Sequence, residues 1–210
     1  SGTAARVEIE IIRPQRTRTL RLRTWSRGTE QALIVIDAPA RDAGTATLKV
    51  GRNLWNYLPK IARTIRVPPS MMKGSWMGSD FSNDDLVRES SYLDDYTSEL
   101  VGGVATPPAW IVRLNARPGV PGLWERIELL FEEGEELPSQ ASFFDRKGRL
   151  SRTMYLREVR EMNGRLIPTH ISIVPEREAG RRTEMKYLHA EFDLDLDESM
   201  FSLGHLERLR

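Results

Sequence analysis

Acidic residues near the end of the chain are the first candidates for chemistry, because carboxylate oxygens are preferred ligands of Ca²⁺. Asp193, Asp195 and Asp197 alternate there, at the spacing that opens an EF-hand loop. The residues between them are leucines, which alternate with the acids as the buried residues of a strand do. Glu198 also occupies the glycine position of the EF-hand loop. We interpret this segment as the end of a strand and predict no metal site.

Two pairs of adjacent carboxylates, Asp84-Asp85 and Asp94-Asp95, are the candidates for general acid–base catalysis. Neighbouring residues point to opposite faces of a strand, and on a helix their directions differ by about 100°. Neither pair would therefore converge on one substrate atom. We expect these residues to lie at helix starts or to contact solvent.

The histidines give no stronger sign of catalysis. His170, His189 and His205 lie on separate segments without the spacing of metal ligands. The sequence has no cysteine and no Gly-x-Ser-x-Gly motif, so no nucleophile with an adjacent base is visible. A lipid hydrolase would need a triad assembled from distant segments and is disfavoured. We predict no catalytic residue, no cofactor and a protein that is not an enzyme.

The composition narrows the class of protein further. The chain has 210 residues, 40% of them hydrophobic, and its 31 Lys and Arg residues are balanced by 30 Asp and Glu residues. Nucleic-acid-binding proteins usually carry a strong net positive charge, whereas the formal charge of this chain is only +1. The longest informative apolar run, Ala32–Ile36, is far shorter than the roughly 18 residues of a membrane-spanning helix. We predict a globular domain that binds no nucleic acid and has no transmembrane segment.

Arginine is concentrated in one segment of the N-terminal part. On a strand, Arg21, Arg23 and Trp25 share one face, so this segment offers a solvated surface, a dock for anionic headgroups or an RNA surface. A solvated surface is the simplest of these, and the sequence leaves the other two open. The arginines of this segment are Arg13, Arg16, Arg18, Arg21, Arg23 and Arg27.

Most of the chain alternates between apolar and polar residues, the pattern of strands with one buried face. Short turns separate the segments, which favours antiparallel neighbours because a parallel connection needs about a dozen residues. Such a sheet must close into a barrel, pair as a sandwich or curl around something. The pattern predicts about eleven or twelve strands, at 7–11, 17–26, 31–38, 45–50, 54–58, 62–67, 110–116, 125–132, 140–145, 150–161, 165–174 and 182–196.

The last of these strands alternates most clearly. Leu188, Ala190 and Phe192 fall on one face, while Tyr187 and His189 fall on the other. The alternation predicts that the first set faces the core.

The alternation is lost over residues 68–93. Two prolines end the preceding strand, and Ser82-x-x-Asp85 resembles a capping box that starts a helix over 84–90. Residues 71–81 hold three of the seven methionines and one tryptophan, which together form an adaptable apolar surface. We expect this segment to cover the open mouth of the sheet, and ordinary packing on the core is the alternative.

Several stretches resemble the outer-membrane lipoprotein-sorting proteins, the family with the LolA-like fold. The most specific stretch is the central one, IRVPPSMM at 65–72 continuing as GSDFSNDDL at 78–86. The others are RTWSRG at 23–28, GTATL at 44–48, NLWNYLPK at 53–60, FDLD at 192–195 and MFS at 200–202. Together they span most of the chain.

The resemblance implies a mainly β fold, a strongly curved antiparallel sheet that forms an unclosed half-barrel with short helices plugging its concave side. It implies a single LolA-like domain over residues 1–210 and a periplasmic location. Because the chain opens with Ser1-Gly2 rather than Met, we expect that the native signal peptide and the family's first helix are missing. No motif identifies which arginine would match a cargo-binding arginine of the family.

The function that the resemblance implies is that of a carrier for lipoproteins or other lipid-like amphiphiles, whose acyl chains lie in a hydrophobic cavity. The implied partners are a lipidated protein or lipid cargo, an inner-membrane exporter and an outer-membrane acceptor. A non-enzymatic accessory interaction module of an envelope lipid-export or efflux machine is the alternative. The residues that we expect at the cavity wall and its lid are Trp55, Tyr57, Met71, Met72, Trp76, Met77 and Phe81.

Overall fold

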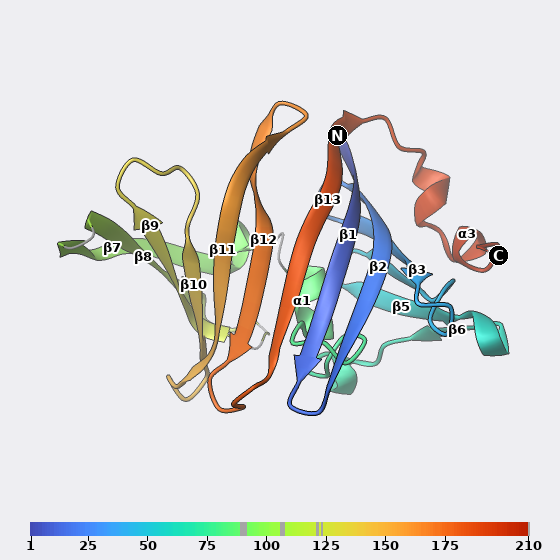
Figure 1. The fold of residues 1–210 in the computed structure, drawn as a ribbon, viewed down its shortest axis with the longest axis horizontal. Coiled ribbons are helices and arrows are strands. Elements are labelled where there is room, and N and C mark those ends of the chain that lie inside the picture. Colours follow the sequence, from blue (N-terminus) through green and yellow to red (C-terminus); the bar gives the residue numbers. More distant parts are fainter. Residues whose placement is uncertain (89–91, 106–107, 121, 123, 210) are drawn as a thin grey trace.

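Thirteen antiparallel strands form one sheet in the computed structural model, which describes residues 1–88, 92–105, 108–120, 122 and 124–209 (Figure 1). The first six strands are β1 (Gly2–Arg13), β2 (Arg16–Arg27), β3 (Gln31–Ala38), β4 (Ala46–Val50), β5 (Asn53–Leu58) and β6 (Arg63–Arg66). The other seven are β7 (Tyr96–Ala105), β8 (Pro108–Ala116), β9 (Trp124–Glu132), β10 (Gln140–Asp145), β11 (Leu150–Met162), β12 (Arg165–Pro175) and β13 (Arg182–Leu194).

The strands lie in the sheet almost in the order of the chain. Strands β1–β6 form one meander and β7–β13 form another, and the pairing of β1 with β13 joins the two. Strands β6 and β7, which are consecutive in the sequence, therefore form the two opposite edges of an unclosed sheet. The predicted mainly β, half-barrel architecture is confirmed.

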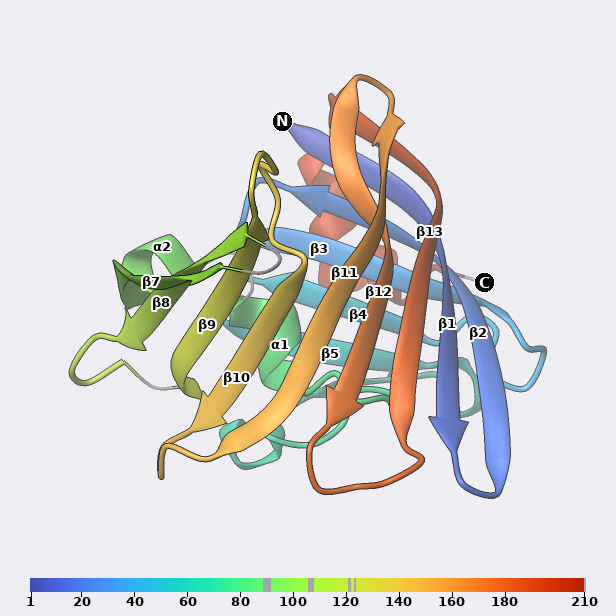
Figure 2. The ribbon, with the colours of Figure 1, turned by 60° about the vertical axis from the view of Figure 1, so that its left-hand side comes forward.

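Irregular pairing bends this sheet. Bulges interrupt the pairing of β1 with β13, of β2 with β3 and of β7 with β8, and also both pairings of β10. A bulge adds one residue to a strand, which bends the strand and increases its twist. In Figure 2, strands β9–β12 accordingly lie in front of β3–β5, with α1 (Asn83–Arg88) between them. The curved sheet thus has a concave face that holds a helix.

One bulge corrects the predicted faces of the last strand. Arg6 pairs with His189 and Val7 pairs with Tyr187, so Leu188 is the extra residue. The alternation shifts by one at this point: Tyr187 faces the interior, whereas Leu188 is 55% exposed. The prediction that Leu188 faces the core was wrong because a strict period of two cannot continue through a bulge.

The segment that joins the two edge strands crosses the concave face of the sheet, and we call residues 67–95 the insert. It contains the 3₁₀ turn η2 (Pro69–Met71), α1 and α2 (Tyr92–Asp95). The predicted capping box is confirmed, because Ser82 Oγ accepts a hydrogen bond from the Asp85 N–H at 3.1 Å and the Asp85 carboxylate accepts one from the Ser82 N–H at 2.7 Å. Helix α1 begins one residue before the predicted start, and the predicted end, Ser90, lies outside the described residues.

The C-terminal segment covers part of the other, convex face. The 3₁₀ turn η4 (Glu198–Phe201) and helix α3 (Leu203–Leu206) follow β13. Phe201 and Leu206 pack there against Leu33 and Leu48 of β3 and β4. Within the described part of the chain, no helix combines the length and the apolar character needed to cross a membrane.

Strand β7 is the strand that the sequence pattern missed. Its apolar residues Leu100, Val101 and Val104 are exposed, and Gly102-Gly103 interrupts it. After the buried Tyr96, residues 97–104 are all exposed, and an edge strand without a buried face has no reason to alternate. Each of the twelve predicted strands has a counterpart in the sheet, with ends that differ by at most five residues.

We expect Leu206→Ala to lower the free energy of unfolding by about 2–5 kcal/mol, because the fully buried leucine would leave a cavity between α3 and β4. Urea denaturation followed by circular dichroism measures this loss. A loss below about 0.5 kcal/mol, the size typical of surface substitutions, would contradict the packing of the C-terminal segment on the sheet.

Candidate functional site

A cavity of about 300 Å³ lies between the concave face of the sheet and the insert. Its walls come from both halves of the sheet, β1–β3 and β8–β13, and are mainly apolar. Val7 and Ile9 face Tyr187 and Met185 across the pairing of β1 with β13, and all four line the cavity. The insert contributes Trp76, Phe81, Asp85 and Leu86.

A tight turn positions Trp76 in this cavity. Met77 and Gly78 both have a positive φ, 51° and 76°, and the Ser79 N–H donates to the Trp76 carbonyl at 2.9 Å. This geometry is that of a type I′ turn, which reverses the chain over four residues. The Trp76 ring is 3% exposed, and its Nε1 donates to Thr47 Oγ1 at 3.0 Å. The indole is therefore fixed to β4 and cannot swing freely.

A buried ion pair, Asp85–Arg152, connects the insert to β11. The Arg152 guanidinium donates to both carboxylate oxygens of Asp85, at 2.7 and 2.8 Å. It also contacts two neighbouring aromatic rings, Trp124 and Phe143, with its Cζ atom 4.6 and 4.5 Å from the two ring centroids. Both members of the pair are buried. Removing either partner would leave an uncompensated charge in the interior.

The surroundings of Asp85 keep it ionised. Burial alone would raise the pKa of this carboxyl, but the charge of Arg152 and the hydrogen bonds from Arg152 and Ser82 outweigh burial and lower the pKa below its usual range. The pair therefore stays charged on both sides at neutral pH.

A second buried carboxylate ties the insert to the other half of the sheet. The Asp80 side chain is 2% exposed and pairs with Arg13 at 3.1 Å and with Arg181 at 2.8 Å. It also accepts a hydrogen bond from Thr183 Oγ1 at 2.6 Å. Asp80 and Asp85 together hold the insert to β1, to the β12–β13 loop, to β13 and to β11.

Two of the seven residues predicted for the cavity wall and lid, Trp76 and Phe81, line the cavity. Met77 packs on the same apolar cluster without lining the cavity. Met72 is half-buried and Met71 is 59% exposed, both in the insert but away from the cavity lining. Whether any of these residues binds a ligand stays a prediction.

Trp55 and Tyr57 lie on the opposite face of the sheet. They pack in the cluster that contains Phe201 and Leu206 of the C-terminal segment. Asn56, between them, faces the concave side, where it accepts a hydrogen bond from Thr47 Oγ1 at 2.8 Å. The cavity wall therefore includes neither aromatic residue, because the alternation of β5 turns both toward the convex face.

The sequence interpretation missed the wall residues from β8–β13, among them Phe143, Arg152 and Met154. Alternation in β10 and β11 did mark them as one face of a strand. It could not tell which face would become concave, because that depends on the direction in which the whole sheet curls.

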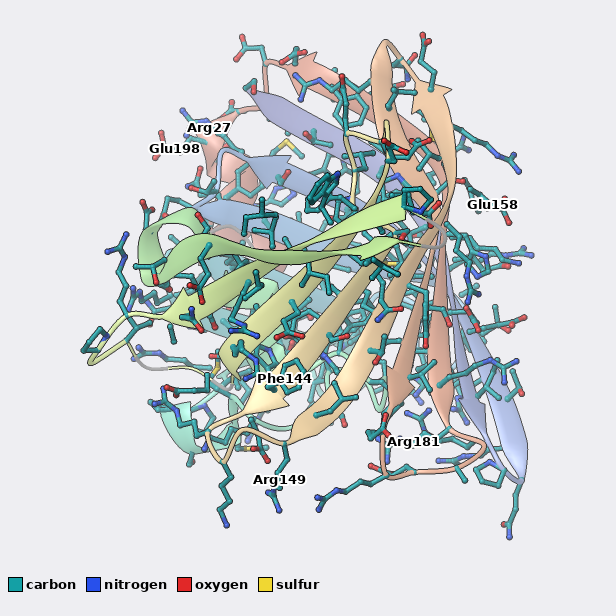
Figure 3. The ribbon with its side chains drawn as sticks, turned by 90° about the vertical axis from the view of Figure 1, so that its left-hand side faces the viewer. Arg27, Phe144, Arg149, Glu158, Arg181 and Glu198 are labelled. Atoms are coloured by element: carbon teal, nitrogen blue, oxygen red, sulfur yellow. The ribbon has the colours of Figure 1, made fainter. Side chains whose placement is uncertain are left out.

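The arginine-rich segment of β1 and β2 is largely neutralised by acids. Arg13, Arg18, Arg21, Arg23 and Arg27 pair with Asp80, Asp42, Glu8, Asp37 and Glu198, respectively. Figure 3 shows Arg27 next to Glu198. This pairing favours a structural role over a dock for anionic groups or RNA at this segment.

Comparisons with known proteins match this chain to a family model and to solved structures with the same fold. A family model described only as an uncharacterized protein matches residues 28–208. A search of the curated proteins returned no match.

Three solved structures share the fold. A Vibrio parahaemolyticus domain assigned to the outer membrane lipoprotein-sorting proteins is 21% identical, with a TM-score of 0.85, covering 99% of this chain and 92% of that one. A DUF1329 family protein from Desulfovibrio piger is 24% identical, with a TM-score of 0.88 and coverages of 98% and 91%. A LolA superfamily protein from Nitrosomonas europaea is 22% identical, with a TM-score of 0.81 and the same coverages, 98% and 91%.

Acid should weaken the Asp85–Arg152 pair. Because the pKa of Asp85 is lowered by folding, the stabilisation from this carboxylate is complete above the unfolded-state value near 4 and is lost as the pH falls through the folded-state pKa. We expect the melting temperature of the wild type to drop below pH 4 more steeply than that of Asp85→Leu/Arg152→Met. Equal slopes in thermal melts from pH 7 to pH 2.5 would contradict the assignment.

At neutral pH, we expect Asp85→Asn alone to cost about 3–5 kcal/mol of stability, because Arg152 stays buried without its counter-charge. Urea denaturation at pH 7 measures the change. Asp94→Asn, an exposed carboxylate of the insert, is the control. If the two variants lose equal stability, the buried pair is not the main anchor of α1.

Proposed function

The chain belongs to the family of uncharacterized proteins whose model it matches and has the fold of outer membrane lipoprotein-sorting proteins, and on this premise we propose that it is a periplasmic carrier of lipoproteins or similar amphiphiles. The acyl chain of the cargo would occupy the cavity between sheet and insert. The single observation that carries the proposal is this mainly apolar cavity of about 300 Å³, covered by the insert.

The physical chemistry of the cavity supports this role. Transfer of an acyl chain out of water contributes roughly 0.8 kcal/mol for each CH₂ group, so binding needs no covalent step. The cavity lies at the lower end of the range for small-molecule sites, about 300–1,000 Å³. A cargo with several acyl chains would require the insert to move away from the sheet.

The insert would act as the lid in this proposal. It is held by the Asp85–Arg152 pair on one side and by Asp80 with Arg13 and Arg181 on the other. Loading from an inner-membrane exporter and transfer to an outer-membrane acceptor would each need contacts that favour an open insert over a closed one.

The accessory interaction module is the alternative proposal, and the edge at β7 and β8 supports it. Leu100 and Trp110 are 65% and 51% exposed there. An edge strand with exposed apolar residues can pair with a strand of another protein. Cargo in the cavity would favour the carrier, and capture of a partner through this edge with an empty cavity would favour the module.

A substitution that fills the cavity tests the carrier. Ala141 of β10 is buried and lines the cavity. We expect Ala141→Phe to weaken binding of the neutral fluorescent probe N-phenyl-1-naphthylamine by tenfold or more, about 1.4 kcal/mol. Fluorescence titration gives the dissociation constant, and circular dichroism shows whether the variant is folded.

Trp55→Phe is the matched control, because Trp55 packs on the convex face. It should bind the probe as the wild type does. Unchanged affinity in a folded Ala141→Phe variant would show that the probe binds elsewhere and would remove the cavity from the proposal.

Native mass spectrometry of the protein purified from a cell envelope tests the cargo itself. The carrier proposal expects an adduct with the mass of a lipid or an acylated peptide. A clean protein mass, together with failure to take up added amphiphiles, would contradict the carrier and leave the interaction module.

A further inference from the structure

A second cavity, of about 570 Å³, lies beside the apolar one. Four segments line it: Gly122 with Trp124 of β9, the insert around Lys73 and Asp80, residues 145–152 of the β10–β11 turn, and residues 175–181 of the β12–β13 loop. Figure 3 shows Arg149 and Arg181, from the last two segments, at the same end of the sheet. We call this cavity the basic pocket.

The basic pocket concentrates positive charge in a chain that is nearly neutral overall. Its lining holds seven basic residues against the acids Asp80, Asp145 and Glu178, while Asp85 and Glu125, from outside the lining, pair with two of the seven. The whole chain carries a formal charge of only +1. Concave walls focus the field of such charges on the space between them. The basic residues are Lys73, Arg146, Lys147, Arg149, Arg152, Arg177 and Arg181.

The acids of the pocket are already engaged. Asp80 and Glu178 pair with Arg181, and Asp145 pairs with Arg149. Among the residues that the structure describes, the side chains of Lys73, Lys147 and Arg177 are exposed and make no hydrogen bond or ion pair. These three side chains are therefore available to a ligand.

The β10–β11 turn carries three of the seven basic residues, Arg146, Lys147 and Arg149, and its shape is fixed by hydrogen bonds. Hydrogen bonds from the Arg149 guanidinium, the Arg149 N–H and the Lys147 N–H lower the pKa of Asp145 to about 2. Asp145 is therefore ionised at any physiological pH and holds the turn through residue 149. The Arg146 guanidinium, in turn, donates to the carbonyls of Val120 and Gly122 at 2.9 and 3.2 Å.

The basic pocket adjoins the apolar cavity. Phe81 and Arg152 line both. Arg152 is 5% exposed, and its Nε is buried without a hydrogen-bond partner in the described structure. A buried donor without an acceptor is costly.

We propose that the basic pocket binds the anionic headgroup, a phosphate or carboxylate, of an amphiphile whose acyl chain lies in the adjoining apolar cavity. This inference rests on the carrier function proposed above and specifies its cargo as anionic. Arg177 and the β10–β11 turn contact the headgroup, and Phe81 separates head from tail.

Two amphiphiles with the same tail test the proposal. Displacement of N-phenyl-1-naphthylamine by dodecyl phosphate and by dodecanol reports the affinity of each for the apolar cavity. We expect the wild type to prefer the phosphate by roughly tenfold or more, as charge-assisted contacts would give, and the preference to shrink as salt is raised.

The variant Lys147→Ala/Arg177→Ala removes two exposed cations that support no other contact, so it should fold as the wild type does. We expect it to lose most of the preference for dodecyl phosphate and to keep the wild-type affinity for dodecanol. Lys60→Ala/Arg63→Ala removes an equal exposed charge outside the pocket and should leave the preference unchanged.

The outcomes separate the two proposals. Displacement by both amphiphiles without a preference, or a preference that survives in Lys147→Ala/Arg177→Ala, overturns the headgroup site and leaves the carrier standing. Inorganic phosphate that competes with dodecyl phosphate at equal affinity overturns the link between the pocket and an amphiphile. Failure of both amphiphiles to displace the probe contradicts the carrier and, with it, the headgroup site.

Discussion

The arrangement around the concave face depends on one buried ion pair, Asp85–Arg152. The described part of helix α1 has six residues, and an isolated helix shorter than about 12 residues is only marginally stable, so α1 needs tertiary contacts to form. The Asp85 carboxylate supplies one such contact by binding Arg152 of β11, and it also completes the local capping box with Ser82. One carboxylate thus starts the helix, attaches the insert to the sheet and holds Arg152, which lines both the apolar cavity and the basic pocket.

Sheet topology explains why an insert should be there at all. The two edge strands, β6 and β7, are consecutive in the chain but lie at opposite ends of a thirteen-stranded sheet. One segment must connect them, and in a strongly curved sheet it crosses the concave face, as Figure 2 shows. The cavity and its cover are therefore consequences of the same strand order. The sequence of the insert provides the side chains that attach it to the sheet. These are the buried carboxylates of Asp80 and Asp85 and the Trp76 indole, which donates a hydrogen bond to Thr47.

The sequence predicted local structure well and the faces of the sheet less well. Twelve strands, the capping box at Ser82 and the insert were all predictable, because each depends on residues close together in the chain. The bulge at Leu188 and the convex position of Trp55 were not, because a period of two assigns residues to two faces without naming the buried one. Here both faces of β3–β5 are covered, one by the insert and the other by the C-terminal segment. Aromatic residues on β5 therefore gave no signal of which side holds the cavity.

The distribution of charge separates two kinds of arginine that look alike in the sequence. Those of β1 and β2 form the densest basic stretch, yet five of them have acidic partners. Those of the basic pocket are scattered over residues 146–181 and gather only when the sheet curls, which is why no stretch of sequence predicted them. Because the insert also lines this pocket through Lys73, Asp80 and Phe81, a ligand held there would contact both the sheet and its cover. A ligand that binds the closed arrangement more tightly than the open one stabilises the closed one. Binding of a headgroup in the pocket would therefore favour closure of the insert over the acyl chain, and loss of the headgroup contacts would favour release.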